Sequence, residues 1–521
     1  MDAATIHQRR WLALGVLTLS FLVVAIDNTI LNVALPTLQE EFSASSSQLQ
    51  WIVDSYVIVF ASLLLTAGSL GDRFGRRGGL ELGLVLFGTV SIGAAFAPSA
   101  GALIVFRGLM GIGAALIMPA TLSILTNVFT EPAERGKAIG VWAGVSGLGI
   151  AIGPVVGGWL LENFWWGAAF LVNIPVAVIA LVAGRRFVPT SRDPNASRLD
   201  LLGTLLSFGG LAALLYGIIE APSHGWSDTG VLAGFGGGIV ILAAFVAWEL
   251  HTDHPVLDIR FFRNPRFSGA SIAIMLVFFA MFGSIYFLTQ YQQFTLGYTA
   301  LQSGLGTAPV AIIIMVAAPL SSLFNRRLGT KVTVASGLVV VAGALLLLST
   351  MTPTTGYGFL LASILLLGFG MGTAMAPATD SIMGALPMEK AGVGSAVNDT
   401  TREVGGALGV AILGSLGAAG YHSSMDDSSV VAVLPQQARE IARDHVGGAF
   451  EVARRLGTQA QPLVTEANEA FVNAMSGTLR IAALFALAGA LVAAVFLPSR
   501  PDDGPGLDTE HEGGERLALA D

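Results

Sequence analysis

Long apolar runs alternate with short polar segments along almost the whole chain. A membrane-spanning helix needs about 20 predominantly apolar residues. The runs of that length cover residues 11–34, 48–70, 79–98, 101–125, 137–161, 167–187, 200–221, 229–250, 267–290, 301–324, 332–351, 357–380, 391–419 and 474–497. No small-residue cleavage site ends the first run, which is therefore predicted to be an uncleaved helix. The pattern predicts an all-α polytopic membrane protein with 14 transmembrane helices.

The composition agrees with this class and excludes several kinds of site. Of the 521 residues, 53% are hydrophobic and only 12% are charged, whereas a soluble domain carries about 25% charged residues. The chain has no cysteine, which excludes disulfides and thiolate metal sites. The few histidines lack metal-ligand spacing, and there is no Walker A motif for ATP. We therefore predict no metal, no cofactor and no nucleic-acid partner.

The distribution of basic residues predicts the orientation in the membrane. With the N-terminus inside, most of the 27 Lys and Arg residues fall in cytoplasmic segments, and the short external loops have none. Cytoplasmic loops carry such an excess of Lys and Arg. One long external segment holds Arg439, Arg443, Arg454 and Arg455, where charge has little effect on topology. Both termini are predicted to be cytoplasmic.

The spans divide into two halves. Six spans fill an N-terminal half, 11–188, and six fill a C-terminal half, 267–498, with two extra spans at 200–250. The loop GSLGDRFGRR after span two has a weaker echo, NRRLGTK, after span ten. Paired halves with the substrate site between them are a known transporter plan. We expect spans seven and eight to pack outside the two halves.

Two polar segments follow span thirteen and the last span. Residues 420–474 include a stretch with helical periodicity and charged faces, which indicates a short external helical hairpin. A disordered loop is the alternative. The tail at 499–521 is acidic and contains Gly and Pro, so it is predicted to be disordered.

The fifth span, GVWAGVSGLGIAIGPVVGGW, is rich in glycine. Three glycines spaced by four make one flat stripe, which allows another helix to pack closely. A proline in the same run is expected to bend the helix. These residues and the glycine that follows the stripe are Gly149, Gly153, Pro154, Gly157 and Gly158. We expect the stripe to pack against span ten, although a glycine-rich span can also be an ordinary tightly packed helix.

The loop after span two combines glycines with charges. Its glycines permit a tight turn, its carboxylate can cap the next helix or pair across the halves, and its arginines face the cytoplasm. The residues are Gly68, Gly71, Asp72, Arg73, Gly75, Arg76 and Arg77. The expected role is a conformational latch on the outward-facing state; the alternative is a merely positive cytoplasmic loop.

Arg107 lies within span four, where a charge is costly and normally has a partner. Counted along the helices, Asp27 in span one and Asp54 in span two reach a similar depth. We therefore predict a polar cluster of Asp27, Asp54 and Arg107. A purely structural ion pair is the alternative for Arg107, and a position at the membrane interface is the alternative for Asp54.

Span thirteen carries two acids, Asp399 and Glu403, which share a helix face because they are four residues apart. Desolvation and mutual repulsion favour proton uptake by at least one of them, and a lipophilic cation would replace the lost proton. Arg402 can pair with Glu403 or reach the cytoplasmic side. If Arg402 neutralises one acid, the group is structural instead.

Further polar residues are candidates for a cavity wall. Asn28 and Asn32 in span one are four residues apart and share one face. The run YFLTQYQQF ends span nine and includes Tyr291 and Gln292. An aromatic belt at the membrane interface is the simpler explanation of that run, and a cavity wall is the more specific one.

Several of these motifs resemble one family. The order G-x-x-x-G-P-x-x-G-G in span five is similar to the antiporter motif of drug:proton exporters of the major facilitator superfamily, and GSLGDRFGRR resembles that superfamily's loop signature. AIDNTILNVALP resembles the first-span motif of its fourteen-span drug:proton antiporters. FWWGAAFLVNIPV, WIVDSY and the acid pair of span thirteen are similar to the QacA-type branch.

The resemblance implies a major facilitator fold and proton-coupled efflux by alternating access in a bacterial cytoplasmic membrane. Its substrates would be lipophilic, mostly cationic drugs such as quaternary ammonium compounds, dyes and antibiotics. The partners would be protons, these small molecules and the lipid bilayer, and the protein would be a monomer. It also implies that Asp27 takes up a proton and that Asn28 and Asn32 line the cavity. Span ten carries no acid here, although that branch can have one, which argues against efficient handling of divalent cations.

Two other classes fit the composition. An exporter of an endogenous metabolite, antibiotic or lipid would use the same fold. A polytopic lipid or glycan transferase would need carboxylates and basic residues gathered at a membrane face, but the only large loop lacks an evident acid–His or metal cluster. The sequence therefore favours a transporter and not an enzyme.

Overall fold

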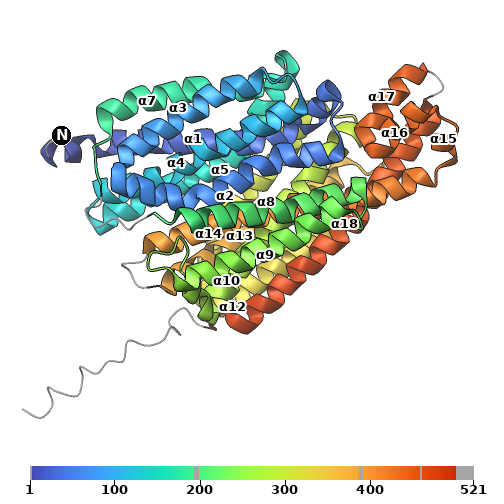
Figure 1. Cartoon of the computed structure of the whole chain (residues 1–521). Coiled ribbons are helices and arrows are strands. Elements are labelled where there is room, and N and C mark those ends of the chain that lie inside the picture. Colours follow the sequence, from blue (N-terminus) through green and yellow to red (C-terminus); the bar gives the residue numbers. More distant parts are fainter. Residues whose placement is uncertain (1–2, 193–198, 387–390, 458–459, 500–521) are drawn as a thin grey trace, which may run out of the picture.

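The computed structural model describes residues 3–192, 199–386, 391–457 and 460–499. Nearly all of the predicted tail at 499–521 lies outside these residues. The long helices run side by side in one bundle (Figure 1), and every regular element that is described is helical. Three short helices, α15, α16 and α17, cover one end of the bundle, which we call the hairpin end; the N-terminus lies at the other, the terminus end.

The first half contains seven helices. They are α1 (Ala3–Phe42), α2 (Ser46–Phe74), α3 (Arg76–Ala95), α4 (Ala100–Val128), α5 (Pro132–Asn163), α6 (Ala168–Leu171) and α7 (Asn173–Phe187). Polar side chains mark two of the helix starts: Ser45 forms a capping box with Gln48 before α2, and Ser99 accepts a hydrogen bond from the N–H of Ala102 before α4. Within this half α2 and α3 pack on α4, and α1 packs on α5 and α7.

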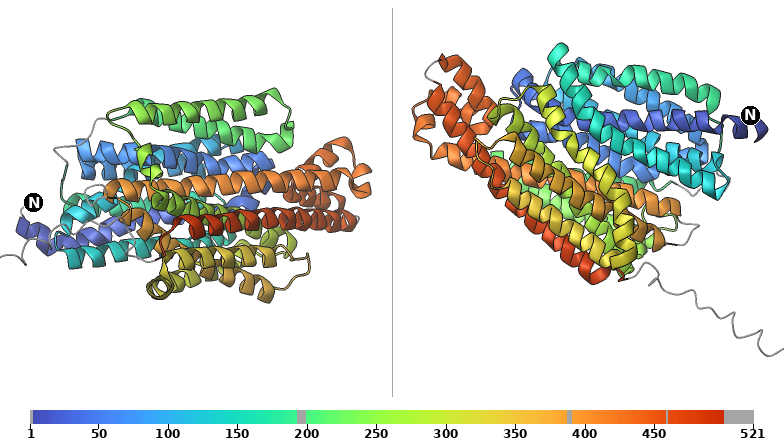
Figure 2. Two further views of the ribbon diagram at one scale, coloured as in Figure 1. Left: turned by 90° about the horizontal axis from the view of Figure 1, so that it is seen from below. Right: turned by 180° about the vertical axis from the view of Figure 1, so that it is seen from behind.

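The second half and the connecting helices complete the bundle. The connection holds α8 (Leu201–His224), α9 (Thr229–His251) and the short η1 (Ile259–Arg263). The second half holds α10 (Pro265–Gln290), η2 (Tyr291–Thr295), α11 (Ala300–Thr307), α12 (Pro309–Leu348), α13 (Tyr357–Gly384), α14 (Ala391–Asp426), α15 (Ser429–Ala432), α16 (Gln436–Asp444), α17 (Val446–Leu456) and α18 (Gln461–Phe496). In the right-hand view of Figure 2, the blue-to-cyan helices and the yellow-to-red helices lie mostly on opposite sides of the bundle.

Among the described residues, 12 helices are long and apolar enough to cross a membrane. This number treats Ala300–Leu348 as one span, although Gly329 has non-helical angles (φ 82°, ψ 162°) and breaks α12 there. A positive φ of this size favours glycine, which has no Cβ. The 32-residue α5 is not among the 12. The finding confirms a polytopic helical protein, and the predicted number of 14 spans is not confirmed by it.

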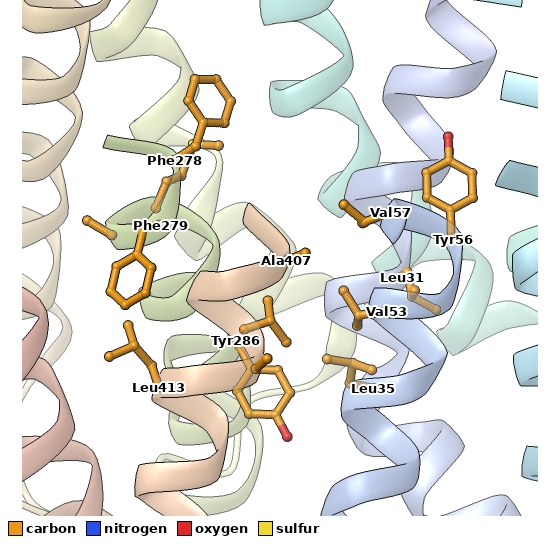
Figure 3. Close-up of a cluster of buried hydrophobic side chains, with 14 of the residues drawn as sticks. Leu31, Leu35, Val53, Tyr56, Val57, Phe278, Phe279, Tyr286, Ala407 and Leu413 are labelled. Atoms are coloured by element: carbon orange, nitrogen blue, oxygen red, sulfur yellow. The ribbon is translucent and has the colours of Figure 1, made fainter. Parts of the chain in front are cut away.

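The hydrophobic core continues across the boundary between the halves. Figure 3 shows Leu35 and Val53 of the first half facing Tyr286 and Ala407 of the second. All four side chains are at most 5% exposed. The main contacts across the boundary are α2 with α14 and α5 with α11. Lipid is as apolar as these side chains, so close packing and hydrogen bonds, more than the hydrophobic effect, hold such helices together.

The inserted helices lie along this boundary. α8 packs against both α2 and α14, and α9 packs on α8 (Figure 1). The hydroxyl groups of Thr66 on α2 and Thr204 on α8 are 2.5 Å apart. The residues before α10 return along the same side, where the N–H of Leu257 donates to the buried carboxyl of Glu249. α8 therefore covers one edge of the boundary between the halves.

The glycine stripe of α5 packs differently from the prediction. A Cβ at Gly149 or Gly153 would collide with Ala25 or Thr29 of α1, and a Cβ at Gly157 would press on Ile30 of α1. The stripe therefore packs against span one, and the expectation of span ten was wrong for these three glycines. Pro154 and Gly158, on a neighbouring face, are the residues that contact α11. α5 therefore packs closely against two helices, because residues without a large side chain lie on two of its faces.

Several contacts join the halves at the hairpin end. The side-chain amide of Gln293 donates to the carbonyl of Val33 (3.0 Å), and the N–H of Leu301 donates to Glu162 (3.2 Å).

The segment predicted to form an external hairpin contains α15–α17. Its residue Asp444 accepts a hydrogen bond from the N–H of Ser46 (3.3 Å). Burial alone would raise the pKa of Asp444, but the hydrogen bond from His422 and the positive charge available on the histidines lower it below its ordinary value.

The α1–α5 contact predicts the effect of a larger side chain. Gly153→Leu should lower the free energy of unfolding by about 1–3 kcal/mol, because overpacking forces the two helices apart. The measurement is the thermal unfolding temperature of the purified protein in detergent. Gly343→Leu on α12 is the matched control, because a Cβ at Gly343 meets nothing within 4 Å. Equal unfolding temperatures for both variants would contradict this packing.

Candidate functional site

A buried ion pair lies inside the first half. Arg107 on α4 is 0% exposed and its Nη1 lies 2.6 Å from Oδ2 of Asp27 on α1. The side-chain amide of Asn173 on α7 donates to the other oxygen of Asp27 (2.8 Å). Nε of Arg107 donates to the carbonyl of Ile52 on α2 (3.2 Å), and its guanidinium lies 4.2 Å from the ring centre of Tyr56. Four helices therefore meet at this pair.

Asp54 does not join this cluster. It is fully buried on α2, and neither of its oxygens has a hydrogen-bond partner among the described residues. The predicted cluster of three is therefore wrong in this respect, since only Asp27 and Arg107 pair. The sequence placed the three residues at similar depth, but the direction in which α2 points Asp54 depends on how that helix is rotated. A buried carboxyl without a partner is costly, so Asp54 stays a candidate for proton uptake.

The acids of α14 lie where that helix meets its neighbours in the second half. Arg402 lies 3.9 Å from Asp399, donates to the hydroxyl of Thr379 on α13 (3.2 Å), and has its guanidinium 5.4 Å from the ring centre of Phe278 on α10. Glu403 makes no ion pair among the described residues. Arg402 therefore pairs with Asp399 and not with Glu403, the partner named in the sequence analysis. Asp399 therefore has an ion pair, and Glu403 has none among the described residues.

The remaining cavity candidates divide between the halves. The amide of Asn32 donates to the carbonyl of Asn28 (3.3 Å) on α1, and its own oxygen has no partner among the described residues. Tyr291, in the π-helical turn η2, donates its hydroxyl to the carbonyl of Thr352 (2.7 Å), and Gln292 donates to Thr307 (3.3 Å). These two residues are engaged within the second half, at the hairpin end.

The charged loop between α2 and α3 makes local contacts. Gly75 has φ 118°, which favours glycine and turns the chain from α2 into α3. Arg76 pairs with Asp72 (2.6 Å) and reaches the carbonyl of Ser123 at the end of α4 (3.5 Å). Arg77 pairs with Glu81 (2.8 Å). All these partners belong to the first half, and among the residues that the structure describes Asp72 makes no ion pair across the halves.

Three residues that contact the buried charges were not predicted from the sequence. Asn173, Tyr56 and Thr379 all bind an arginine or its partner carboxylate. The only signal for Asn173 was an amide in the middle of an apolar span, directly before Ile-Pro. Tyr56 and Thr379 have no such signal, because an aromatic ring or a hydroxyl is common in spans without any polar partner.

The sequence and the fold now place the chain in a family. The family model described as Major Facilitator Superfamily matches residues 17–410. The chain therefore belongs to the major facilitator superfamily, and it is a transporter of that superfamily and not an enzyme. Solved structures agree on the fold: a bacterial homologue of the human lysosomal transporter Spinster has a TM-score of 0.65 at 17% identity, covering 94% of this chain and 98% of that one.

Curated relatives are similar over almost their full length. The multidrug efflux pump LfrA of Mycolicibacterium smegmatis is 39% identical over 488 residues, which is 94% of this chain and 96% of the relative. The tetracenomycin C resistance and export protein of Streptomyces glaucescens is 32% identical, with 96% and 94% covered. The methyl viologen resistance protein SmvA of Salmonella typhimurium is 33% identical, with 89% and 93% covered.

The buried pair predicts a thermodynamic cycle. Arg107→Met should lower the free energy of unfolding by about 3–5 kcal/mol, because it leaves Asp27 buried without its cation. The double variant Asp27→Asn/Arg107→Met removes both charges and should recover part of that loss. The measurement is the unfolding temperature in detergent. A double variant less stable than Arg107→Met would contradict the coupling.

Proposed function

We propose that the protein exports lipophilic, mostly cationic drugs from the cytoplasm in exchange for protons. The observation that carries this proposal is Glu403, a carboxyl with no ion pair among the described residues, beside the compensated Asp399 and near the boundary between the halves. Apolar walls bind rings and a carboxylate binds the positive charge. The names of the relatives, which are efflux and resistance proteins for several drugs, support the same function.

The exchange needs a proton or a substrate cation to neutralise the substrate-binding carboxyl in each state. A proton bound from outside would neutralise Glu403 and release the cation, and loss of that proton inward would restore the site. Asp27 would act differently, because Arg107 and Asn173 already hold it. Protonation of Asp27 would free Arg107 and loosen the contacts among four helices. Asp27 would thereby couple proton uptake to movement, while Glu403 and Asp399 would bind substrate.

We further propose 14 spans of the QacA-like branch, with α5 as one span and α12 divided at Gly329 into two. The halves would be 11–188 and 267–498, with 200–250 as inserted spans. The terminus end would face the cytoplasm, since Arg76, Arg77 and Arg185 lie there, and the hairpin end would face outside. The protein would be a monomer in a bacterial cytoplasmic membrane. The contacts that close the hairpin end support an inward-facing state.

The motif residues would serve the movement between states. The α5–α11 contact at Pro154 and Gly158 would separate as the halves rock. The Asp72–Arg76 loop would latch in the opposite, outward-facing state. Asn28, Asn32, Tyr291 and Gln292 would line the path. An endogenous metabolite or lipid as substrate is the alternative, and competition by cell lipids in a transport assay would favour it.

Proton release gives the direct test of coupling. Adding ethidium to the purified protein should release protons, because cation and proton compete for the same carboxyls. The variant Asp27→Asn/Asp399→Asn/Glu403→Gln should release none, which a pH-sensitive dye would report. Glu440→Gln, an exposed acid on α16, is the control and should behave as the unmodified protein. Proton release and dye export that persist in the triple variant would exclude these acids as the coupling site.

Single substitutions should have separable effects. Asp27→Asn should weaken export of most substrates several-fold, because it disturbs the arginine network that all substrates depend on. Asp399→Asn and Glu403→Gln should each affect only some cations, because these acids would contact substrate directly. The measurement is a dye-efflux panel in cells lacking their own exporters, with and without a protonophore. Identical substrate profiles for all three variants would contradict this division of roles.

A further inference from the structure

One arginine inside a span faces away from the rest of the protein. Arg107 and Arg402, which also lie well inside spans, contact carboxylates and rings. Arg480 on α18 is exposed, and it has no hydrogen bond, ion pair or ring contact among the described residues. α18 runs along one edge of the bundle (Figure 1). A charge that faces hydrocarbon normally has a partner, so the partner of Arg480 must come from outside the chain.

The depth of Arg480 follows from two landmarks. Ser476 on α18 donates its hydroxyl to the carbonyl of Ser349, directly after the end of α12, and Arg480 lies one turn, about 6 Å, further in. Counted from Phe496 at the other end of α18, Arg480 lies about 24 Å along the helix, whereas a hydrocarbon core is about 30 Å thick. Both landmarks place its backbone about 6 Å inside the hydrocarbon. An arginine side chain reaches the headgroups from this depth.

The surface next to Arg480 leaves room for a headgroup. Helical side chains lean toward the N-terminus of their helix, which for α18 is at the hairpin end, and this directs Arg480 past Gly477 toward Asn473. Both of these residues are exposed. A Cβ at Gly477 would meet nothing within 4 Å, so packing among the described residues does not require a glycine here. We call Asn473, Gly477 and Arg480 the α18 notch.

The same face of α18 is apolar on the other side of the arginine. Its exposed residues there are Leu484, Leu487, Leu491 and Val495, and their spacing of three or four residues keeps them on the face of Arg480. The strip from Arg480 to Val495 is about 22 Å long, which exceeds the roughly 15 Å of hydrocarbon in one leaflet. A polar notch followed by an apolar strip matches the order of groups in a phospholipid and not a free phosphate ion.

The charge of the notch selects the kind of phospholipid. A guanidinium group binds phosphate through two parallel hydrogen bonds, and every phospholipid carries a phosphate. A zwitterionic headgroup also brings an ammonium group, but the nearest acid on α18, Glu469, is about 16 Å from Arg480 along the helix. An anionic headgroup neutralises Arg480 without adding a second cation. The notch therefore favours a lipid with a net negative charge.

We propose that the α18 notch binds the phosphate of one anionic phospholipid in the leaflet at the hairpin end. Arg480 supplies the charge, Asn473 supplies a further hydrogen-bond donor, and Gly477 supplies the space. The site does not depend on the proposed export function, because α18 packs on α10, α12 and α14 of the second half and the notch lies on its outward face. A second copy of the chain is the competing occupant.

A fluorescent label beside the notch tests the choice of lipid. The chain has no cysteine, so Leu484→Cys, one turn from Arg480, carries a single bimane label. In proteoliposomes of equal parts phosphatidylglycerol and phosphatidylethanolamine, brominated phosphatidylglycerol should quench this label more strongly than brominated phosphatidylethanolamine. The local affinities should differ about fivefold, as expected for one basic residue near an anionic headgroup.

A matched label and three variants complete the test. Val316→Cys on α12 is exposed and has no arginine within two turns of its helix, so both lipids should quench its label equally. Beside the Leu484→Cys label, Arg480→Gln should abolish the preference, whereas Arg480→Lys, which keeps the charge without the planar fork, should retain most of it. Gly477→Leu should also abolish the preference, because leucine fills the notch, and should not lower the unfolding temperature.

Each other result overturns the proposal. Equal quenching by the two lipids beside Arg480 would show that this side chain only extends to water. A preference that survives Arg480→Gln would show that another feature attracts the anionic lipid, and one that survives Gly477→Leu would show that no headgroup enters the notch. Disulfide cross-linking of two unlabelled Leu484→Cys chains in the same liposomes, with no preference between the lipids, would show that a second copy covers this face.

Discussion

The ion pair between Asp27 and Arg107 holds the first half together. An arginine inside hydrocarbon needs a partner for its charge and for its N–H groups, and Asp27, Ile52 and the ring of Tyr56 supply most of these contacts. Asp27 belongs to α1, and Ile52 and Tyr56 belong to α2. Asn173 of α7 binds Asp27 in turn, so the contacts of this one arginine of α4 link three other helices. Removing either charge would therefore disturb contacts in all four helices.

The charges inside the second half are paired less completely than those inside the first. Arg402 lies at a longer distance from Asp399 and shares its contacts with Thr379 and Phe278. Glu403 has no cation within ion-pair distance among the described residues. The first half thus holds a fully paired carboxylate, and the second half holds a carboxyl that no ion pair neutralises among the described residues, which is the arrangement that the proposed cation binding requires.

Close helix contacts depend on small residues, and the two faces of α5 show how. Its glycine stripe brings the backbone of α5 against α1, while Pro154 and Gly158 bring it against α11. The first contact lies within a half and the second lies between the halves. A spacing of four residues in the sequence identifies a flat face, but it does not say which neighbour that face meets.

The sequence by itself determined the all-helical class of fold and the residues that carry charge into the membrane. The reason is that lipid admits few solutions: apolar runs of sufficient length must be helices, and the rare charges among them must have partners. Only the tertiary structure decided which partners those are. The rotation of each helix about its axis points Asp27 toward Arg107 and Asp54 away from it. The arrangement of the helices places the glycine stripe of α5 against α1. Rotation and neighbour choice depend on contacts between distant segments, which local periodicity does not record.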